Sequence, residues 1–423
     1  GGIGYTGSEA CQTGYVCTII NAYYYQCLPP GYGTTATPTG TATSTSTTTT
    51  ATGAACSTAP ASAGNLAYGG VNIAGFDFGC GTDGTCVITG SDGPYPPLAS
   101  LGNPDGIGQM THFRKGHIPH VLLVEYPNPR TYASIGQDDG FNIFRLPVGW
   151  QYLVNGVLGG TLDPTNLATY DELVQGCLSA LAYCIIDIHN YARWDGGIIG
   201  QGGPTNDQFV SLWTQLATKY AGYSKIMFGI MNEPHDLDSV TTWAETVQLV
   251  VTAIRNAGAT YQTILLPGND WTSAGTFISD GSAAALSTVT NPDGSFTNLI
   301  FDVHKYLDSD NSGTSAECVT DNIADAFAPL AAWLRCNGRQ ALNTETGGGN
   351  TASCVSYLNS QLAFIRNNSD VFLGYVGWAA GSFDSSYTLS LTPTETGSSW
   401  TDTELITEAF QLYVPQATVS PQK

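Results

Sequence analysis

The most informative stretch of the chain is Gly229-Ile230-Met231-Asn232-Glu233-Pro234-His235. It ends a short apolar segment, Lys225 to Met231, which has the length and composition of a buried strand. The segment stops at a polar Asn-Glu pair, and the following proline prevents a simple continuation of the ladder. Barrel enzymes carry catalytic groups at the carboxyl ends of buried parallel strands. The stretch therefore predicts a barrel strand that ends in a catalytic carboxylate.

A second stretch downstream repeats this arrangement. Residues 340–348 read Gln-Ala-Leu-Asn-Thr-Glu-Thr-Gly-Gly, another short strand that ends in a glutamate, Glu345, and then glycine. Two carboxyl groups are what glycoside hydrolysis needs, because one protonates the leaving oxygen while the other attacks the anomeric carbon or activates water.

Alternating apolar and amphipathic segments predict an α/β fold of parallel βα units. The expected strands are Gly69–Ile73, Asn142–Leu146, Cys184–Ile188, Lys225–Met231, Thr263–Leu266, Leu299–Val303, Gln340–Asn343 and Gly374–Trp378. The expected helices are Ala168–Tyr183, Asn206–Tyr220, Val240–Asn256, Asn322–Cys336 and Cys354–Arg366. Eight strands favour a (β/α)8 TIM barrel. A doubly wound open sheet is the alternative, and it is disfavoured because no Gly-rich phosphate fingerprint follows a strand.

Composition divides the 423 residues into four parts. Residues 1–28 are rich in Gly, Tyr and Cys, and so short a piece needs disulfides to be stable. Residues 29–63 are a Thr/Ser/Pro-rich linker, which we expect to be O-glycosylated. Residues 64–415 form the large α/β domain, and residues 416–423 form a C-terminal tail.

Charge and cysteine content restrict the environment. The 34 acidic and 13 basic residues give a net charge of -21, which argues against partners such as nucleic acid and anionic membranes. No apolar run approaches the ~20 residues of a membrane span. Eleven cysteines indicate an oxidising compartment. The chain starts inside what looks like a folded motif, so we expect a processed or truncated product.

Polar side chains stand at most of the predicted strand ends, on one face of the barrel. From them we expect Arg145 to keep Glu345 ionised, Asn232 to reach a sugar 2-hydroxyl and Tyr306 to contact the nucleophile. Trp378 offers a flat apolar platform for a pyranose ring. We expect His189 and His304 to orient the carboxylates and hydroxyls.

Two other kinds of site are disfavoured. The sequence argues against a serine nucleophile, since the chain has no G-x-S-x-G elbow. A metal site of Asp187, His189 and His304 lacks the spacing of known metal motifs.

With these residues in view, the large domain resembles glycoside hydrolase family five, and in particular its fungal endoglucanases. The motifs that carry the resemblance are VNIAGFDFGC, FRLPVGWQYL, DIHNYARW, GIMNEPHD, LPGNDW, DVHKYLDSDNSGT, TETGGG and GYVGW. The resemblance implies that Glu233 is the acid/base, that Glu345 is the nucleophile and that the enzyme is retaining. It also implies no cofactor and no metal, and it places other site residues at Arg145, His189, Asn232, His304, Tyr306 and Trp378.

The N-terminal piece resembles a fungal family-one cellulose-binding module, through GGIGYTG, the spaced cysteines and NAYYYQC. The resemblance implies a β-rich module whose cellulose-binding face carries Tyr23, Tyr24, Asn21 and Gln26. The family's first cysteine and first platform aromatic would lie before Gly1, so we expect this module to be truncated. By the same resemblances the disulfides are Cys11–Cys27, Cys80–Cys86, Cys177–Cys184 and Cys318–Cys354. Cys17 is then expected to have no partner in this chain, and Cys56 and Cys336 remain as a further candidate pair.

The prediction is thus a secreted, monomeric endo-β-1,4-glucanase acting on cellulose and soluble β-1,4-glucans. A mannanase or xyloglucanase on the same scaffold, or a carbohydrate-binding protein without turnover, stay as alternatives. Asn367 begins the only Asn-x-Ser/Thr sequon and is the expected N-glycosylation site.

One segment departs from the resembling sequences. They pass almost directly from a counterpart of Thr111-His112-Phe113 to one of Asp138-Asp139-Gly140, whereas this chain has a basic insertion between them. Arg114-Lys115 can be encoded as CGT-AAG, which contains a fungal splice-donor sequence. We predict that residues 115–136 are a retained intron, and a genuine family-specific loop is the alternative.

Overall fold

The computed structural model describes residues 16–21, 24–28, 64–114, 140–397 and 399–416. The chain divides into two compact units, Gly1–Ala55 and Cys56–Lys423. In the first unit, strands β1 (Val16–Asn21) and β2 (Tyr24–Leu28) pair antiparallel. Asn21, Tyr24 and Gln26 lie on these strands, and Tyr23 lies outside the described residues. The boundaries at residues 28 and 63 stay predictions.

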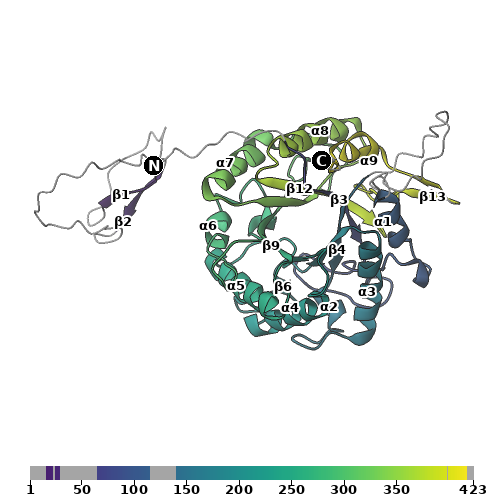
Figure 1. The fold of residues 1–423 in the computed structure, drawn as a ribbon, viewed down its shortest axis with the longest axis horizontal. Helices are drawn as coiled ribbons and strands as arrows, with labels where there is room; N and C mark the ends of the chain where they lie inside the picture. Colours follow the sequence, from purple (N-terminus) through teal and green to yellow (C-terminus); the bar gives the residue numbers. More distant parts are fainter. Residues whose placement is uncertain (1–15, 22–23, 29–63, 115–139, 398, 417–423) are drawn as a thin grey trace, which may run out of the picture. The chain divides into compact units, whose positions relative to one another are not determined.

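The second unit contains a closed barrel of eight parallel strands, with helices around it (Figure 1). Its strands are β3 (Tyr68–Ala74), β4 (Ile143–Val148), β5 (Tyr183–Ile188), β8 (Ile226–Gly229), β9 (Thr263–Pro267), β10 (Leu299–His304), β11 (Ala341–Thr346) and β12 (Phe372–Gly381). β12 pairs with β3 and closes the ring. The barrel prediction is confirmed, and the open-sheet alternative is wrong.

Helices connect the strands. They are α1 (Gly106–Arg114), α2 (Trp150–Leu153), α3 (Pro164–Ser179), α4 (Asn206–Tyr220), α5 (Val240–Asn256), α6 (Ser282–Leu286), α7 (Ala328–Asn337), α8 (Ala352–Asn367) and α9 (Glu404–Glu408). Short 3-10 or π turns are η1 (Ala99–Leu101), η3 (Asp270–Thr272), η4 (Ile323–Phe327) and η5 (Phe410–Tyr413). Two small hairpins are β6 (Arg193–Trp194) with β7 (Gly197–Ile198), and β13 (Thr394–Thr396) with β14 (Ser399–Thr401).

The capping residues explain where the predicted helix bounds agree with the structure and where they differ. α4 and α5 have the predicted bounds, and each begins after a capping residue, Thr205 or Ser239. The predicted helix Ala168–Tyr183 is wrong at both ends. α3 begins at Pro164, because the Asp163 carboxylate accepts from two backbone N–H groups and proline suits the first helical position. The helix ends at Ser179, and Tyr183 belongs to β5.

The inward face of the strands carries two layers, which follow from the two-residue period of a strand. The lower layer is apolar and takes one buried side chain from each of seven strands: Ile143, Ile185, Met227, Leu265, Ile300, Leu342 and Val376. Two residues further along four of these strands, the inward side chains are polar: Arg145, Asp187, Asp302 and Thr344. The polar layer therefore rests on a packed floor at the carboxyl ends of the strands.

Three disulfides lie in the described part of the barrel domain: Cys80–Cys86, Cys177–Cys184 and Cys318–Cys354. All three confirm the pairing that the resemblance implied. Cys336 is also disulfide-bonded. Its expected partner Cys56 lies outside the described residues. Cys27 of the expected Cys11–Cys27 bridge lies on β2, but Cys11 lies outside the described residues, so that bridge stays a prediction.

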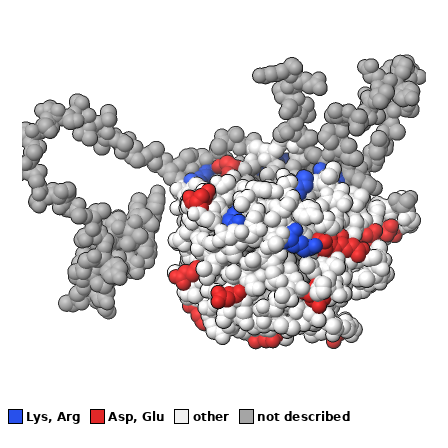
Figure 2. Space-filling view, turned by 60° about the horizontal axis from the view of Figure 1, so that its bottom comes forward, with Lys and Arg blue, Asp and Glu red and all other residues white. Residues whose placement is uncertain are grey.

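The surface carries few charged side chains, as the composition of the chain predicts. In the face that Figure 2 shows, small groups of acidic and basic side chains are separated by uncharged surface. None of the helices in the described ranges is long and apolar enough to cross a membrane. Asn367 is exposed at the last residue of α8, where a glycan can be accommodated. The predicted intron, residues 115–136, lies outside the described residues.

Candidate active site

Two glutamates lie together at the carboxyl ends of the strands. Glu345 is the fifth residue of β11, and Glu233 follows β8 in a loop where its φ of 40° is left-handed. One carboxylate oxygen of each glutamate and a ring nitrogen of His304 all lie within 4.8 Å of one another. Retaining glycosidases have carboxyl groups about 5–5.5 Å apart, whereas inverting enzymes need about 6.5–9.5 Å to admit a water molecule. The spacing therefore fits the retaining arrangement.

Arg145 ties the nucleophile candidate to three neighbouring strand ends. Its Nη1 donates to Glu345 Oε1 and, over 3.0 Å, to Asn72 Oδ1. Its Nη2 donates to Asn232 Oδ1 over 2.7 Å and lies 3.0 Å from Asp187 Oδ1. The contact with Glu345 was expected, but the roles of Asn72 and Asp187 were missed. Both stand in motifs quoted above, at the ends of β3 and β5, which was the available signal.

These contacts control the ionisation of Glu345. Burial raises its pKa, but the positive charges of His304 and Arg145 and a hydrogen bond from Tyr306 outweigh burial, so the pKa of Glu345 is lowered. The Tyr306 hydroxyl donates to Glu345 Oε2 over 2.8 Å, the contact that the sequence predicted. A carboxylate held in this way is ionised at mildly acidic pH, as a nucleophile must be.

The surroundings of Glu233 are different. Its side chain is 15% exposed, against 5% for Glu345. Its Oε1 lies 2.8 Å from His304 Nδ1. His304 Nε2 lies 2.9 Å from the Thr344 hydroxyl. Burial lowers the pKa of His304, but the carboxylates of Glu345, Glu233 and Asp302 outweigh burial and raise it.

His189 bonds a carboxylate other than the two glutamates, and its expected role in orienting groups of the site stays a prediction. Its Nδ1 lies 2.9 Å from Asp187 Oδ2, and its ring stacks on Trp378 with centroids 5.5 Å apart and planes 13° apart. The indole N–H of Trp378 donates to the Tyr387 hydroxyl over 2.9 Å. The bond between Trp378 and Ala379 is a cis peptide. His189 therefore positions Trp378 and Asp187.

Asn232 offers one free donor within the site. Its Oδ1 accepts from Arg145, so its amide nitrogen points the other way. That nitrogen is buried and has no hydrogen-bond partner among the described residues. A substrate hydroxyl is a suitable partner for such a donor.

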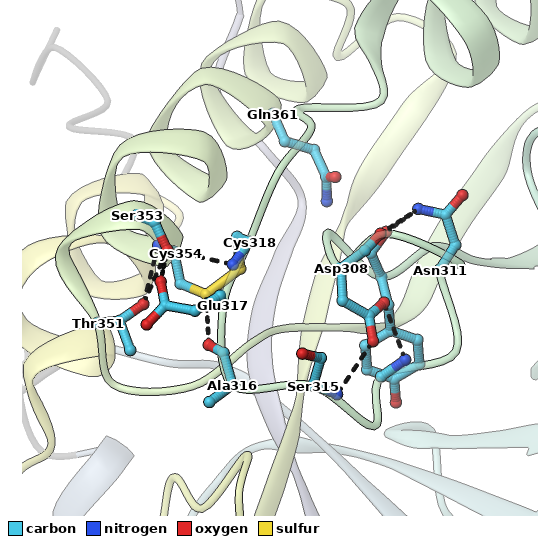
Figure 3. Close-up of a disulfide and its surroundings, with 12 residues drawn as sticks. Asp308, Asn311, Ser315, Ala316, Glu317, Cys318, Thr351, Ser353, Cys354 and Gln361 are labelled. Carbon is cyan, nitrogen blue, oxygen red and sulfur yellow. Dashed lines mark hydrogen bonds between the residues drawn. A yellow bond between two sulfur atoms is a disulfide. The ribbon is translucent and has the colours of Figure 1, made fainter.

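The loop after β10, which Figure 3 shows around Asp308, Asn311 and Cys318, fixes Tyr306 through hydrogen bonds. The side chains of Asn311 and Asn322 donate to the Tyr306 carbonyl oxygen over 2.8 and 2.9 Å. The Asp308 carboxylate accepts from the backbone N–H groups of residues 313–315. The Cys318–Cys354 disulfide then joins this loop to the first turn of α8. The loop is thereby closed on itself and attached at both ends.

A cluster of aromatic rings near the site was missed. Trp271 is 37% exposed, has a left-handed backbone with φ of 61° and stacks on His235 at 4.0 Å. Tyr191 packs its edge against Trp271 at 5.9 Å. Trp271 ends the LPGNDW motif, which begins in β9 and runs past its end, so its place after a strand was a readable signal.

The metal trio that the sequence raised is not formed. Asp187 and His189 contact each other, but His304 faces Glu233 and Thr344. Among the described side chains, the group close enough to share an ion is Glu233, His304 and Glu345, the catalytic candidates themselves.

Comparisons with known proteins agree with this geometry. Residues 109–383 match the family described as Cellulase (glycosyl hydrolase family 5), and residues 1–24 match the Fungal cellulose binding domain. The chain is 62% identical to "Endoglucanase EG-II" of Hypocrea jecorina over 414 residues, which are 97% of this chain and 92% of that protein. It is 44% identical to "Manganese dependent endoglucanase Eg5A" of Phanerodontia chrysosporium over 95% of this chain and 92% of that one.

A solved structure has the same fold. The crystal structure of Cel5A (EG2) from Hypocrea jecorina superposes with a TM-score of 0.75 and 63% identity, covering 84% of this chain and 99% of that chain.

Proposed function

This chain belongs to the cellulase family, glycosyl hydrolase family 5, and we propose that it is an endo-β-1,4-glucanase that works by a retaining double displacement. The observation that carries the mechanism is the approach of the Glu233 and Glu345 carboxylate oxygens to within 4.8 Å. The substrate is cellulose and soluble β-1,4-glucans, cut at internal bonds.

In the first step, ionised Glu345 attacks the anomeric carbon while Glu233 gives its proton to the glycosidic oxygen. The C–O bond breaks, the shortened chain leaves as an alcohol, and a glycosyl ester forms on Glu345. Arg145 and Tyr306 hold both oxygens of Glu345, so the attacking carboxylate is oriented before substrate binds. The free amide donor of Asn232 is placed for the sugar 2-hydroxyl, a bond that strengthens in the transition state.

In the second step, Glu233, now a carboxylate, takes a proton from water. The water oxygen attacks the anomeric carbon, and the bond from that carbon to the Glu345 oxygen breaks, so the configuration is retained overall. Glu345 is again a carboxylate and Glu233 is again protonated. Trp378 supplies an apolar platform for the sugar bound at the nucleophile.

Three features of the whole protein belong to the same proposal. The four cysteine pairs of the expected framework fit an oxidising, extracellular location. The protein acts as a secreted monomer. The match of residues 1–24 to a cellulose-binding domain supports attachment to solid cellulose. We assign this contact to Tyr23, Tyr24, Asn21 and Gln26.

Assays on carboxymethyl cellulose, mannan and xyloglucan side by side test the substrate. Rapid loss of carboxymethyl cellulose viscosity, with slower cleavage of the others, is expected. Preference for mannan or xyloglucan would replace the glucanase assignment, and binding without cleavage would indicate a non-catalytic protein.

A cellobioside with fluorine at carbon 2 and a good leaving group tests the mechanism, because it slows hydrolysis of the ester. We expect a covalent adduct on Glu345, located by mass spectrometry of peptides. Glu345→Gln should remain folded and lose turnover, and azide should not rescue it with retained stereochemistry. An enzyme that turns over with inversion and forms no adduct would contradict the proposal.

A further inference from the structure

A chain of hydrogen bonds leads from the acid/base candidate into the barrel interior. Glu233 Oε1 lies 2.8 Å from His304 Nδ1, and His304 Nε2 lies 2.9 Å from the Thr344 hydroxyl. That hydroxyl donates to Asp302 Oδ1. Asp302 and Thr344 are fully buried, and the mechanism above does not use either.

The direction of this chain follows from counting protons. A threonine hydroxyl has one proton, which Thr344 gives to Asp302, so Thr344 can only accept from His304. His304 Nε2 must therefore carry a hydrogen. Its Nδ1 is then free either to accept a proton from Glu233 or, in the imidazolium form, to donate to the Glu233 carboxylate.

We propose that Asp302 and Thr344 are positioning residues that fix the Nε2–H form of His304 and so hold the catalytic proton between His304 and Glu233. This inference rests on the acid/base role of Glu233 in the proposed function. One proton is shared by the pair: Glu233 carries it when His304 is neutral, and His304 Nδ1 carries it when Glu233 is ionised. Without Thr344, His304 can place its hydrogen on Nδ1, donate it permanently to Glu233 and keep that carboxylate ionised.

The charges around His304 favour retention of the shared proton. Glu233 faces Nδ1 from the loop after β8, and Glu345 Oε2 lies 3.6 Å from the same nitrogen. Asp302 Oδ1, on β10, lies 3.9 Å from Nε2. Two positively charged or ionisable groups oppose these carboxylates. Arg145 is paired with Glu345, and His189 is paired with Asp187. Asp302 is the nearest negative charge on the Nε2 side and favours the protonated form of the pair. The alkaline limb of the pH–activity profile should therefore lie at a higher pH than it would without this charge.

The first test is Thr344→Val, which removes the hydroxyl, with Thr344→Ser as the conservative partner. The pH profile of kcat/KM on cellooligosaccharides should lose about one pH unit from its alkaline limb in Thr344→Val. Activity at the optimum should fall roughly tenfold, part of the usual contribution of acid–base catalysis. Thr344→Ser should restore both.

The matched control is Thr246→Val. Thr246 is equally buried, but its hydroxyl donates to Asn206 between α4 and α5. Thr246→Val should lose as much Tm as Thr344→Val does, and its pH profile of kcat/KM should be unchanged. Asp302→Asn keeps an oxygen acceptor for Thr344 and removes the negative charge, so it should move the alkaline limb to lower pH.

The second test uses the leaving group. A cellobioside of a strongly acidic phenol needs little protonation to depart, so the Thr344→Val defect in kcat/KM should shrink to about twofold on it. An equal defect on both substrates, or an unshifted alkaline limb in both Thr344→Val and Asp302→Asn, would overturn the proposed relay, which is the chain of hydrogen bonds from Glu233 through His304 and Thr344 to Asp302.

Failure of the relay can be told from failure of the proposed function through Glu233→Gln. If that variant loses cellooligosaccharide hydrolysis but still cleaves the activated cellobioside, the acid/base role stands and the outcome for Thr344 decides the relay alone. If it hydrolyses both substrates normally, the acid/base assignment itself is wrong.

Discussion

At the scale of single residues, Arg145 is the clearest example of a side chain that could not be replaced by another of the same charge. Its guanidinium reaches Glu345, Asn72, Asn232 and Asp187 through two nitrogens, and it is fully buried. Burial opposes its charge, but the nearby carboxylates of Asp187 and Glu345 raise its pKa. A lysine presents one compact ammonium and cannot make these contacts together.

We therefore expect Arg145→Lys to lower kcat/KM on cellooligosaccharides by roughly a hundredfold, because misplacement of a nucleophile by about 1 Å costs that much. Arg335→Lys is the control, since Arg335 makes a two-pronged pair with Asp370 away from the site, at 2.6 and 2.7 Å. Arg335→Lys should have a lower Tm and an unchanged kcat/KM. An unchanged kcat/KM in Arg145→Lys as well would show that the two-pronged contacts of the Arg145 guanidinium are not needed.

The lowered pKa of Glu345 predicts a pH-dependent contribution to stability. Its ordinary value is 4.5, and the folded value is lower, so the ionised group stabilises the fold above pH 4.5 and this stabilisation is lost as pH falls through the folded value. Gln at this position mimics the protonated form. At pH 6, Glu345→Gln should be less stable than the parent by roughly 1 to 3 kcal/mol, and the difference should narrow below pH 4.5. Urea unfolding at pH 3.5, 4.5 and 6 measures it, and a gap that widens toward acid would refute the assigned direction.

At the scale of elements, the loop between β10 and η4 packs a glycine against the ring of Tyr306. Gly313 has φ of 70°, and a Cβ there would come within 2.7 Å of the Tyr306 ring. Gly294 has a similar φ of 79°, but its Cβ would meet nothing within 4 Å. Alanine at either position would have to adopt the left-handed region, but only at position 313 would its Cβ also contact another side chain.

Alanine at either glycine should cost about 1 kcal/mol of stability, because a residue with a Cβ is disfavoured in the left-handed region. Gly313→Ala should additionally lower kcat, because it displaces the tyrosine that donates to Glu345, whereas Gly294→Ala should keep the parent kcat. The comparison needs chemical denaturation and steady-state kinetics of both variants. A Gly313→Ala enzyme with normal kcat would mean that the loop does not position Tyr306.

At the scale of the whole molecule, the insertion after α1 is the part that the resemblance does not explain. If residues 115–136 are a retained intron, a protein without them should keep or increase its activity, because the segment lies between the end of α1 at residue 114 and the start of β4 at residue 143. Sequencing the mature transcript checks this most directly. A message that still encodes His117 through Arg130 would establish a genuine loop.

Local properties of the sequence were enough to predict the barrel and most of its catalytic rim. Strand length, the two-residue period and polar strand ends are all readable within a few residues, so they place Arg145, Glu233, His304 and Glu345 on one face of the barrel. The same locality explains the agreement of α4 and α5 with their predicted bounds. It also explains the error in α3, where the capping of Asp163 was not recognised.

Which of these side chains meet depends on the tertiary structure alone. His189 and His304 stand at equivalent strand ends, yet one stacks on Trp378 and the other lies beside Glu233. Near His304 the pairing of β10 with β11 has a register shift between Val303 and His304, and the backbone of Glu233 is left-handed. Such features depend on how neighbouring strands pair around a closed ring. The relay through Thr344 to Asp302 joins two neighbouring strands whose residues are far apart in sequence, and no local pattern records it.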